Sequence, residues 1–335
     1  MNKRAFLEGF FAASSVAFGG LYMWQRLNQN PAGMDQTDPA VVSTPNSEKA
    51  LANAAVGESY RLTPVDLEQG MPEKGLPAPA PVLQQPVEVA SLSDQQVSDY
   101  LRKIRNFDAI FASDIYLDPK YEATLVKTAT HLRRVERYIG HGNFNLMGFD
   151  DMLRAGRNFP FIAEFEADEL KFLEEIFFAN PNRYGFFGEK ISHHITEVIP
   201  RNEVAKIGDT GHYLLKGESL NLYEQIRKDV GNRVVLTSGV RSNVKQMHLF
   251  LAKAIESNGN LSRASRSLAP PGHSYHGIGD FDIGKIGLGE KNFTADFSRT
   301  EEYRKIIQLG YIDIRYPTDN LFGVRFEPWH IKINS

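Results

Sequence analysis

A long stretch rich in proline, alanine, glutamine and serine divides this chain of 335 residues. It covers residues 28–90, has few aromatic side chains and shows no helical periodicity. Such a composition buries too little apolar surface to offset the entropy lost when a chain becomes ordered. We therefore expect residues 28–90 to be a disordered tether, with folded structure beginning near residue 91.

The segment before the tether, residues 1–27, begins with basic Lys3 and Arg4 and continues as an apolar stretch interrupted by Glu8. This order is typical of an export signal or a membrane anchor. Residues 3–7 resemble a twin-arginine signal with Lys3 in place of the first arginine, and no A-x-A cleavage site is obvious. A buried helix of a soluble protein is the alternative. We predict a periplasmic protein, exported or anchored in the inner membrane by this segment.

Composition excludes several classes of site and partner. The chain has no cysteine, which excludes disulfides, thiolate zinc sites and a cysteine nucleophile. Histidine, aspartate and glutamate remain as candidate metal ligands. The formal net charge of −3 gives no reason to expect nucleic acid as a partner.

Helical patterns dominate residues 91–215. Ser93 and Gln96 have the spacing of a capping box, and Val97, Tyr100 and Ile104 follow at helical intervals. Residues 124–138 and 166–178 also have helical periodicity. We predict a mostly helical region here, and its role is not visible in the sequence.

Residues 216–335 combine helical and strand patterns. Helices are predicted at residues 220–230, 243–257 and about 300–309, and strands at 233–237, 278–283 and 323–333. Short strands separated by helices favour an α+β fold over a doubly wound sheet. We therefore predict a small antiparallel sheet flanked by helices, preceded by the helical region.

Three motifs in this last third carry candidate chemistry. A hydrolytic zinc site needs three imidazole or carboxylate ligands and an open position for water. His276 and Asp282 lie around a glycine-containing turn, and Asp280 is a rival ligand that shares a strand face with Asp282. His330 would complete the set, and Pro328 would allow a bulge that brings Glu327 into the same cavity. The motifs are Ser238 to Ser242 with Gln246, Pro271 to Asp282, and Glu327 to His330.

Together these motifs resemble the VanY-like zinc D-Ala-D-Ala carboxypeptidases, which trim peptidoglycan stem peptides. The resemblance covers about residues 220–333 and rests on Ser-x-His-x-x-Gly with a following Asp, on Glu-x-Trp-His, and on Ser-Gly-x-Arg-Ser with a later Gln. It implies zinc as cofactor and peptidoglycan peptides as partners.

By position, the resemblance assigns His276 and His330 as zinc ligands and Glu327 as the catalytic base. It assigns Arg241 to the substrate carboxylate or the developing oxyanion, and we predict that Arg241 anchors the terminal carboxylate of the substrate. Ser274 and Gln246 match supporting polar positions that bind substrate. Asp282 follows His276 after five residues where the family has six, so Asp280 competes for the metal; the Phe281-Asp282-Ile283-Gly284 setting favours Asp282.

We predict a zinc metallopeptidase, and within that class a D-alanyl-D-alanine carboxypeptidase. An L,D-carboxypeptidase or a peptidoglycan endopeptidase is the alternative, because the motifs do not determine which bond is cleaved. From another class, a non-catalytic wall-binding module with a degenerate metal site would fit the short His-to-Asp spacing. Glu327 argues against it, because binding alone needs no base. His193 and His194 could form a second metal site, although a loop position is the simpler interpretation.

Overall fold

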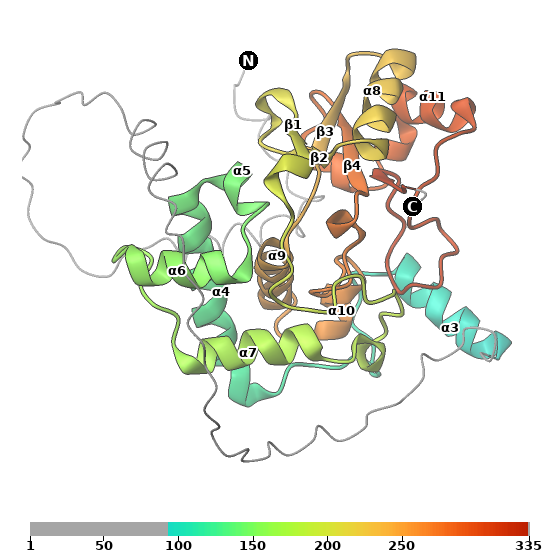
Figure 1. Cartoon of the computed structure of the whole chain (residues 1–335). Helices are drawn as coiled ribbons and strands as arrows, with labels where there is room; N and C mark the ends of the chain where they lie inside the picture. Colours follow the sequence, from blue (N-terminus) through green and yellow to red (C-terminus); the bar gives the residue numbers. More distant parts are fainter. Residues whose placement is uncertain (1–92, 334–335) are drawn as a thin grey trace, which may run out of the picture. The chain divides into compact units, whose positions relative to one another are not determined.

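The computed structural model describes residues 93–333 (Figure 1). All of them belong to one compact unit, Pro86–Ser335. The predicted signal or anchor at residues 1–27 and the predicted tether at residues 28–90 lie outside the described residues. Within residues 93–333, no helix combines the length and the apolar character needed to span a membrane.

The helical region begins where its capping box predicts. Ser93 accepts a hydrogen bond from the backbone of Gln96, whose side chain bonds back to Ser93, and a second capping box joins Glu166 and Glu169. The predicted helices at residues 124–138 and 166–178 are confirmed within a few residues. The region contains α3 (Asp94–Arg105), α4 (Glu122–Ile139), α5 (His141–Phe144), α6 (Phe149–Asn158) and α7 (Ala167–Phe178).

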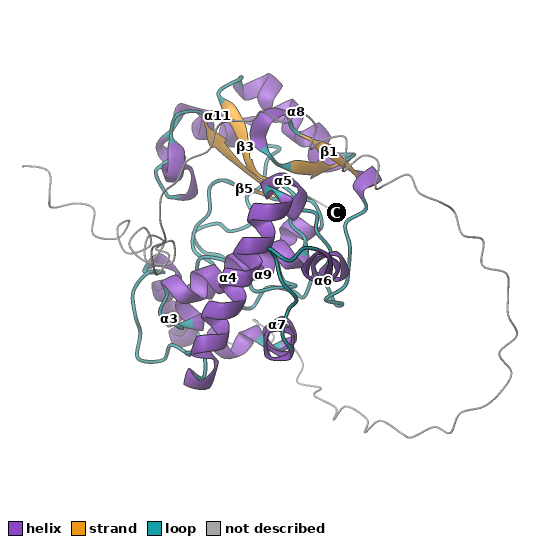
Figure 2. Cartoon of the chain, turned by 90° about the vertical axis from the view of Figure 1, so that its left-hand side faces the viewer, coloured by secondary structure: helices purple, strands orange, loops and turns teal. Residues whose placement is uncertain are grey.

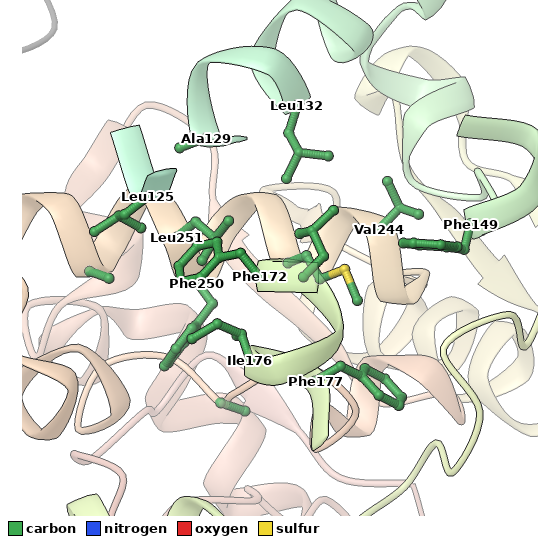
Figure 3. Close-up of a cluster of buried hydrophobic side chains, with 14 of the residues drawn as sticks. Leu125, Ala129, Leu132, Phe149, Phe172, Ile176, Phe177, Val244, Phe250 and Leu251 are labelled. Carbon is green, nitrogen blue, oxygen red and sulfur yellow. The ribbon is translucent and has the colours of Figure 1, made fainter. Parts of the chain in front are cut away.

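The core of the helical region extends past residue 216. Helix α9 (Asn243–Glu256) packs against α4 and α6. Figure 3 shows Phe250 and Leu251 of α9 facing Leu125 of α4 and Phe172 of α7. We call this apolar cluster the helical core. The division at residue 216 stays a prediction, but side chains from both sides of it are buried in the same cluster.

A small antiparallel sheet lies at the other end of the molecule (Figure 2), and the predicted α+β architecture is confirmed. Its strand order is β3-β4-β5, and α8 and α11 lie beside it. Their apolar side chains form a second cluster, the sheet core. The elements are β3 (Val234–Ser238), β4 (Phe281–Lys285), β5 (His330–Ile331), α8 (Glu218–Val230) and α11 (Glu301–Leu309), with a separate hairpin of β1 (Val204–Lys206) and β2 (Tyr213–Leu215).

The remaining elements are short. Helix α10 (Leu261–Ser265) follows α9, and 3₁₀ turns connect the longer elements. These turns are Pro119–Tyr121, Pro181–Tyr184, Arg201–Glu203, Gly208–Thr210, Tyr275–Gly277, Gly289–Phe293 and Phe297–Arg299.

Two strand predictions in the last third were too long. The strand predicted at residues 278–283 begins only at Phe281, because Gly279 has a φ of 122°, which a β-strand does not accommodate. The strand predicted at residues 323–333 is reduced to His330–Ile331, since Pro328 lacks the N–H that a ladder needs. Irregular backbone therefore precedes both strands, and the motif residues lie at these junctions.

Candidate metal centre

The side chains of His276, Asp282 and His330 meet in the structure. One ligand atom from each lies within 4.8 Å of the others, and all three residues are buried. No other group of three His, Cys, Asp or Glu side chains within residues 93–333 meets this spacing. Asp282 and His330 are direct partners across β4 and β5, while His276 comes from the turn Tyr275–Gly277. The sheet register thus brings together residues far apart in the sequence.

A backbone contact orients His276. Its Nδ1–H donates to the carbonyl oxygen of Gly239 at 2.8 Å, which leaves Nε2 without a proton, 3.4 Å from Asp282 Oδ1. Gly239 is required at this position, since a Cβ there would lie 2.0 Å from the carbonyl oxygen of Tyr213. Gly239 of the Ser-Gly-x-Arg-Ser motif therefore allows the backbone of β2 to pack close to it, and its carbonyl oxygen orients the imidazole of His276.

The two rival aspartates differ in their hydrogen-bond partners. Asp280 is held by two hydrogen bonds from Arg315, at 2.7 and 2.9 Å, and by one from the backbone of Ile333 at 2.9 Å. It also accepts from His330 Nε2 at 3.1 Å. Asp282 Oδ1, by contrast, is buried without a hydrogen-bond partner. The geometry therefore favours Asp282 as the metal ligand, with Asp280 orienting the imidazole of His330 from behind.

The donor set fits zinc. Two imidazole nitrogens and one carboxylate oxygen are ligands that zinc accepts in hydrolases. His330 Nδ1 lies 3.6 Å from Asp282 Oδ1, so the unpartnered oxygen faces both candidate nitrogens. A buried carboxylate oxygen without a donor is costly unless a cation or another donor satisfies it.

The pKa values of two of the three candidate ligands, His276 and Asp282, favour the deprotonated forms that bind a metal. Burial, with the charge of Arg241, lowers the pKa of His276 to about 4. Burial alone would raise the pKa of Asp282, but His276 and Arg241 hold it well below the usual range. Burial likewise opposes the charged form of His330, yet hydrogen bonds to Asp280 and Glu327 raise its pKa to about 9. The carboxylates of Asp280 and Glu327, which stabilise a proton on His330, would stabilise a metal cation at the same place when the proton is lost.

Glu327 lies beside the candidate ligands. It is buried, and its Oε2 is 3.3 Å from His330 Nδ1. The N–H of His330 donates to the carbonyl oxygen of Glu327 at 3.2 Å, which closes a turn containing Pro328. This turn replaces the predicted bulge and has the same result, because both side chains enter one cavity.

Arg241 reaches the site from the loop after β3. Its Nε donates to Ser238 at 2.9 Å and its Nη2 to Asp282 Oδ2 at 2.7 Å. The guanidinium thus neutralises the carboxylate oxygen that does not face the histidines. Arg241 and Ser274 line the cavity of about 200 Å³ that contains the candidate ligands.

Two further residues of this cavity were not found by sequence reasoning. Tyr316 is buried, its ring lies 5.0 Å from that of His330, and its hydroxyl has no hydrogen-bond partner within the described structure. Arg325 lies near Glu327. Neither Tyr316 nor Arg325 belongs to a motif. Arg325 could have been suspected from the sequence because it stands two residues before Glu327, whereas nothing in the sequence points to Tyr316.

A second cavity of about 80 Å³ adjoins the first and shares Arg241 and Ser274 with it. Gln246 lines this second cavity and donates to the carbonyl of Ala269 at 2.6 Å. We call residues 191–199, which form one side, the groove wall. Asn243 holds this wall through hydrogen bonds to Ser192 Oγ at 2.7 Å and to the carbonyl of His194 at 3.1 Å.

The other histidines lie apart from the metal centre. His193 and His194 are exposed in the groove wall. His273 is buried and donates from Nδ1 to the carbonyl of Glu189 at 2.8 Å. His212 packs against the ring of His141. None of the four belongs to the candidate ligand cluster.

Comparison with known proteins agrees with the motifs. Residues 216–334 match the family model VanY, D-alanyl-D-alanine carboxypeptidase, so the VanY-like resemblance of this region is confirmed. The match covers the last third of the chain, in which the three motifs lie. No curated protein matches the chain.

Solved structures similar to the chain cover parts of it. The LdcB LD-carboxypeptidase is 25% identical over 36% of this chain, with a TM-score of 0.32, and the match spans only 58% of that protein. A VanY D,D-pentapeptidase variant in complex with Zn(II) is 24% identical over 40% of this chain and 81% of that one, with a TM-score of 0.31. VanYB in complex with D-alanine-D-alanine is 25% identical over 40% of this chain and 80% of that protein, also with a TM-score of 0.31.

Proposed function

We propose that this protein is a zinc-dependent D-alanyl-D-alanine carboxypeptidase that acts on peptidoglycan stem peptides in the periplasm. The observation that carries the proposal is the meeting of His276, Asp282 and His330 within 4.8 Å, with Glu327 at 3.3 Å from His330. The VanY match of residues 216–334 supports the same chemistry.

His276, Asp282 and His330 would hold the zinc, which supplies Lewis acidity and lowers the pKa of a bound water. Glu327 is the proposed general base: its carboxylate accepts the proton of the attacking water and passes it to the departing nitrogen. Burial keeps this carboxylate away from bulk water, which strengthens its interactions within the cavity.

Arg241 supports the reaction from the opposite side of Asp282. A guanidinium stabilises negative charge that develops on a carbonyl oxygen. Of the two roles that the resemblance implies, its contact with Asp282 Oδ2 at 2.7 Å favours the oxyanion, because Asp282 is itself a proposed ligand.

The second cavity provides room for the rest of the stem peptide. A carboxypeptidase releases a single residue, so most of its substrate lies on the other side of the cleaved bond. The groove wall, with Ser274 and Gln246, borders the space that continues from Arg241. We assign the acyl side of the peptide to this groove.

Digestion of defined muropeptides, followed by mass spectrometry, tests the proposed reaction. We expect loss of one D-alanine from pentapeptide stems. Loss of the terminal residue from tetrapeptides would instead assign an L,D-carboxypeptidase, and cleavage within cross-links an endopeptidase. No cleavage of any of these substrates would contradict the enzyme and favour a binding module.

Measurement of the zinc content distinguishes a metal ligand such as His276 from the proposed base Glu327. The full chain should contain about one zinc ion, and His276→Ala should lose it, whereas the exposed His193→Ala should not. Glu327→Gln should keep the zinc and lose roughly 10²–10⁴-fold in rate, since a general base contributes that much. Cleavage by Glu327→Gln at the wild-type rate would show that another group is the base.

A further inference from the structure

The catalytic cavity contains a second arginine, Arg325, that belongs to none of the three motifs. Its Nη2 donates to the carbonyl oxygen of Phe293 at 3.0 Å. Its guanidinium lies 4.6 Å from the ring centre of Phe107 and 5.0 Å from that of Trp329. These contacts position the guanidinium through cation–π interactions rather than through a close ion pair.

Arg325 retains an unused donor. Its Nε is buried without a hydrogen-bond partner. The nearest carboxylate oxygen, Glu327 Oε1, is 3.9 Å from Nε, which is too far for a hydrogen bond. Burial lowers the pKa of Arg325, which indicates that its charge is incompletely compensated, although an arginine stays protonated. A bound anion would satisfy both the charge and the donor.

Arg241 is already engaged. Its Nε and Nη2 donate to Ser238 and Asp282, and the ion pair with Asp282 is 2.7 Å long. A substrate carboxylate at Arg241 would therefore lie beside a carboxylate that is already there, and like charges at that distance repel. Glu327 Oε1 lies 3.9 Å from Arg325 Nε, so an anion at Arg325 would meet a weaker repulsion than an anion at Arg241.

The position of Arg325 also suits a carboxypeptidase. The terminal carboxylate of a substrate is one residue from the attacked carbonyl, a span of at most about 3.6 Å. Its receptor must therefore lie near the catalytic base. Arg325 meets this requirement, since it is adjacent to Glu327, which in turn contacts His330.

We propose that Arg325 binds the C-terminal carboxylate of the substrate and that Phe107 positions it for this role. The assignment rests on the proposed function and adds the residue that makes the site select a free C-terminus. Phe107 precedes the region matched by the family model. Arg266 links the two segments, since its side-chain Nε donates to the carbonyl oxygen of Phe107 at 2.9 Å and its backbone carbonyl oxygen accepts from the N–H of Arg325 at 2.8 Å.

Binding of two matched peptides tests the role of Arg325 without turnover. The zinc-loaded full chain carrying Glu327→Gln would be titrated calorimetrically with diacetyl-lysyl-D-alanyl-D-alanine and with its C-terminal amide. We expect the acid to bind roughly 10–100-fold more tightly than the amide, as a charge-assisted hydrogen bond provides. Adding Arg325→Met should remove this preference, while Arg325→Lys should keep part of it. Arg299→Met, at an exposed arginine, should leave it unchanged.

Three outcomes would overturn the assignment in distinguishable ways. If Arg325→Met keeps the preference and Arg241→Met loses it, the carboxylate binds at Arg241. If the parent binds acid and amide equally, the site does not select a free C-terminus, although the proposed hydrolysis can still hold. If the zinc-loaded parent binds neither peptide, the proposed function fails together with this assignment.

The positioning role of Phe107 has its own readout. Phe107→Ala should reduce the acid-to-amide preference several-fold without loss of zinc, because the guanidinium loses one of its two aromatic contacts. Phe107→Trp should restore the preference. An unchanged preference in Phe107→Ala would show that Phe107 has no part in carboxylate binding.

Discussion

The helical core and the sheet core contribute to the site in different ways. Two of the three candidate ligands lie between members of the sheet core: Asp282 follows Phe281, and His330 stands between Trp329 and Ile331. His276 follows Tyr275, which belongs to the helical core. The metal centre therefore lies where the two cores meet, and its geometry depends on both.

The comparison extends to substrate binding. The helical side supplies the groove wall and Phe107, whereas the sheet side supplies Asp282, His330 and, beside them, Glu327. On the proposed function, catalysis and substrate selection would belong to different parts of one compact unit. This division suggests that residues preceding the VanY match are part of the working site.

Removal of the helical region should have the largest effect. In a chain that begins at Lys216, the buried face of α9 would lose its partners on α4 and α6, including contacts of Val244 and Phe250. We expect no cooperative thermal unfolding by circular dichroism, because the exposed apolar surface is too large. A chain that begins at Pro86 is the control. Cooperative unfolding with zinc binding by the shorter chain would instead make residues 216–335 an autonomous domain.

A matched pair of core substitutions should distinguish the effects of the helical core and of the sheet core on stability and on zinc affinity. Phe250→Ala in the helical core and Phe281→Ala in the sheet core each remove a fully buried ring. Each should lower the free energy of unfolding by about 3–5 kcal/mol in urea titrations. Phe281→Ala should weaken zinc affinity more than Phe250→Ala does, because Phe281 is the immediate neighbour of Asp282 in the sequence. Equal losses of zinc affinity would show that the cores do not act separately on the site.

A smaller effect is expected at Glu136, which joins α4 to α9. It accepts from Lys245 at 2.6 Å and lies 3.1 Å from His248 Nε2. Burial alone would raise its pKa, but hydrogen bonds from His141 and His248 and the charge of Lys245 lower it. A lowered carboxyl pKa stabilises the fold above the ordinary value of 4.5, and that contribution is lost as the pH falls below it.

Glu136→Gln should therefore cost about 1–3 kcal/mol at neutral pH, as expected for hydrogen bonds to charged groups. The difference in melting temperature between wild type and variant should shrink as the pH falls below about 4.5. A constant difference down to pH 3 would contradict a lowered pKa for Glu136.

The smallest effect is expected from Asn243→Ala. This change removes the hydrogen bonds that hold Ser192 and His194 of the groove wall. KM for a pentapeptide stem should rise roughly 2–10-fold, in line with about 0.5–1.5 kcal/mol for a hydrogen bond. KM for a blocked dipeptide, which is too short to reach the wall, serves as the control. Equal changes for both substrates would mean that the wall supports the site without contacting the peptide.

Local sequence patterns determined the helices of this protein and the composition of its candidate metal site. The capping box at Ser93, the periodicity of α4 and α7 and the spacing of the motif around His276 each depend on neighbours a few residues away. His276, Asp282 and His330 were predicted as a ligand set, and the structure brings their side chains together. Such features are readable because helix and turn geometry depends on short separations along the chain.

Only the tertiary structure distinguished the two aspartates and revealed the second arginine. Asp280 is engaged by Arg315, which is distant in sequence, so that Asp282 Oδ1 is the oxygen left facing the histidines. Arg325 acquires its surroundings from Phe107, more than two hundred positions earlier in the sequence. Contacts between distant segments decide which polar atoms have hydrogen-bond partners and which, such as Asp282 Oδ1 and Arg325 Nε, have none within residues 93–333. The spacing of residues along the chain does not encode those contacts.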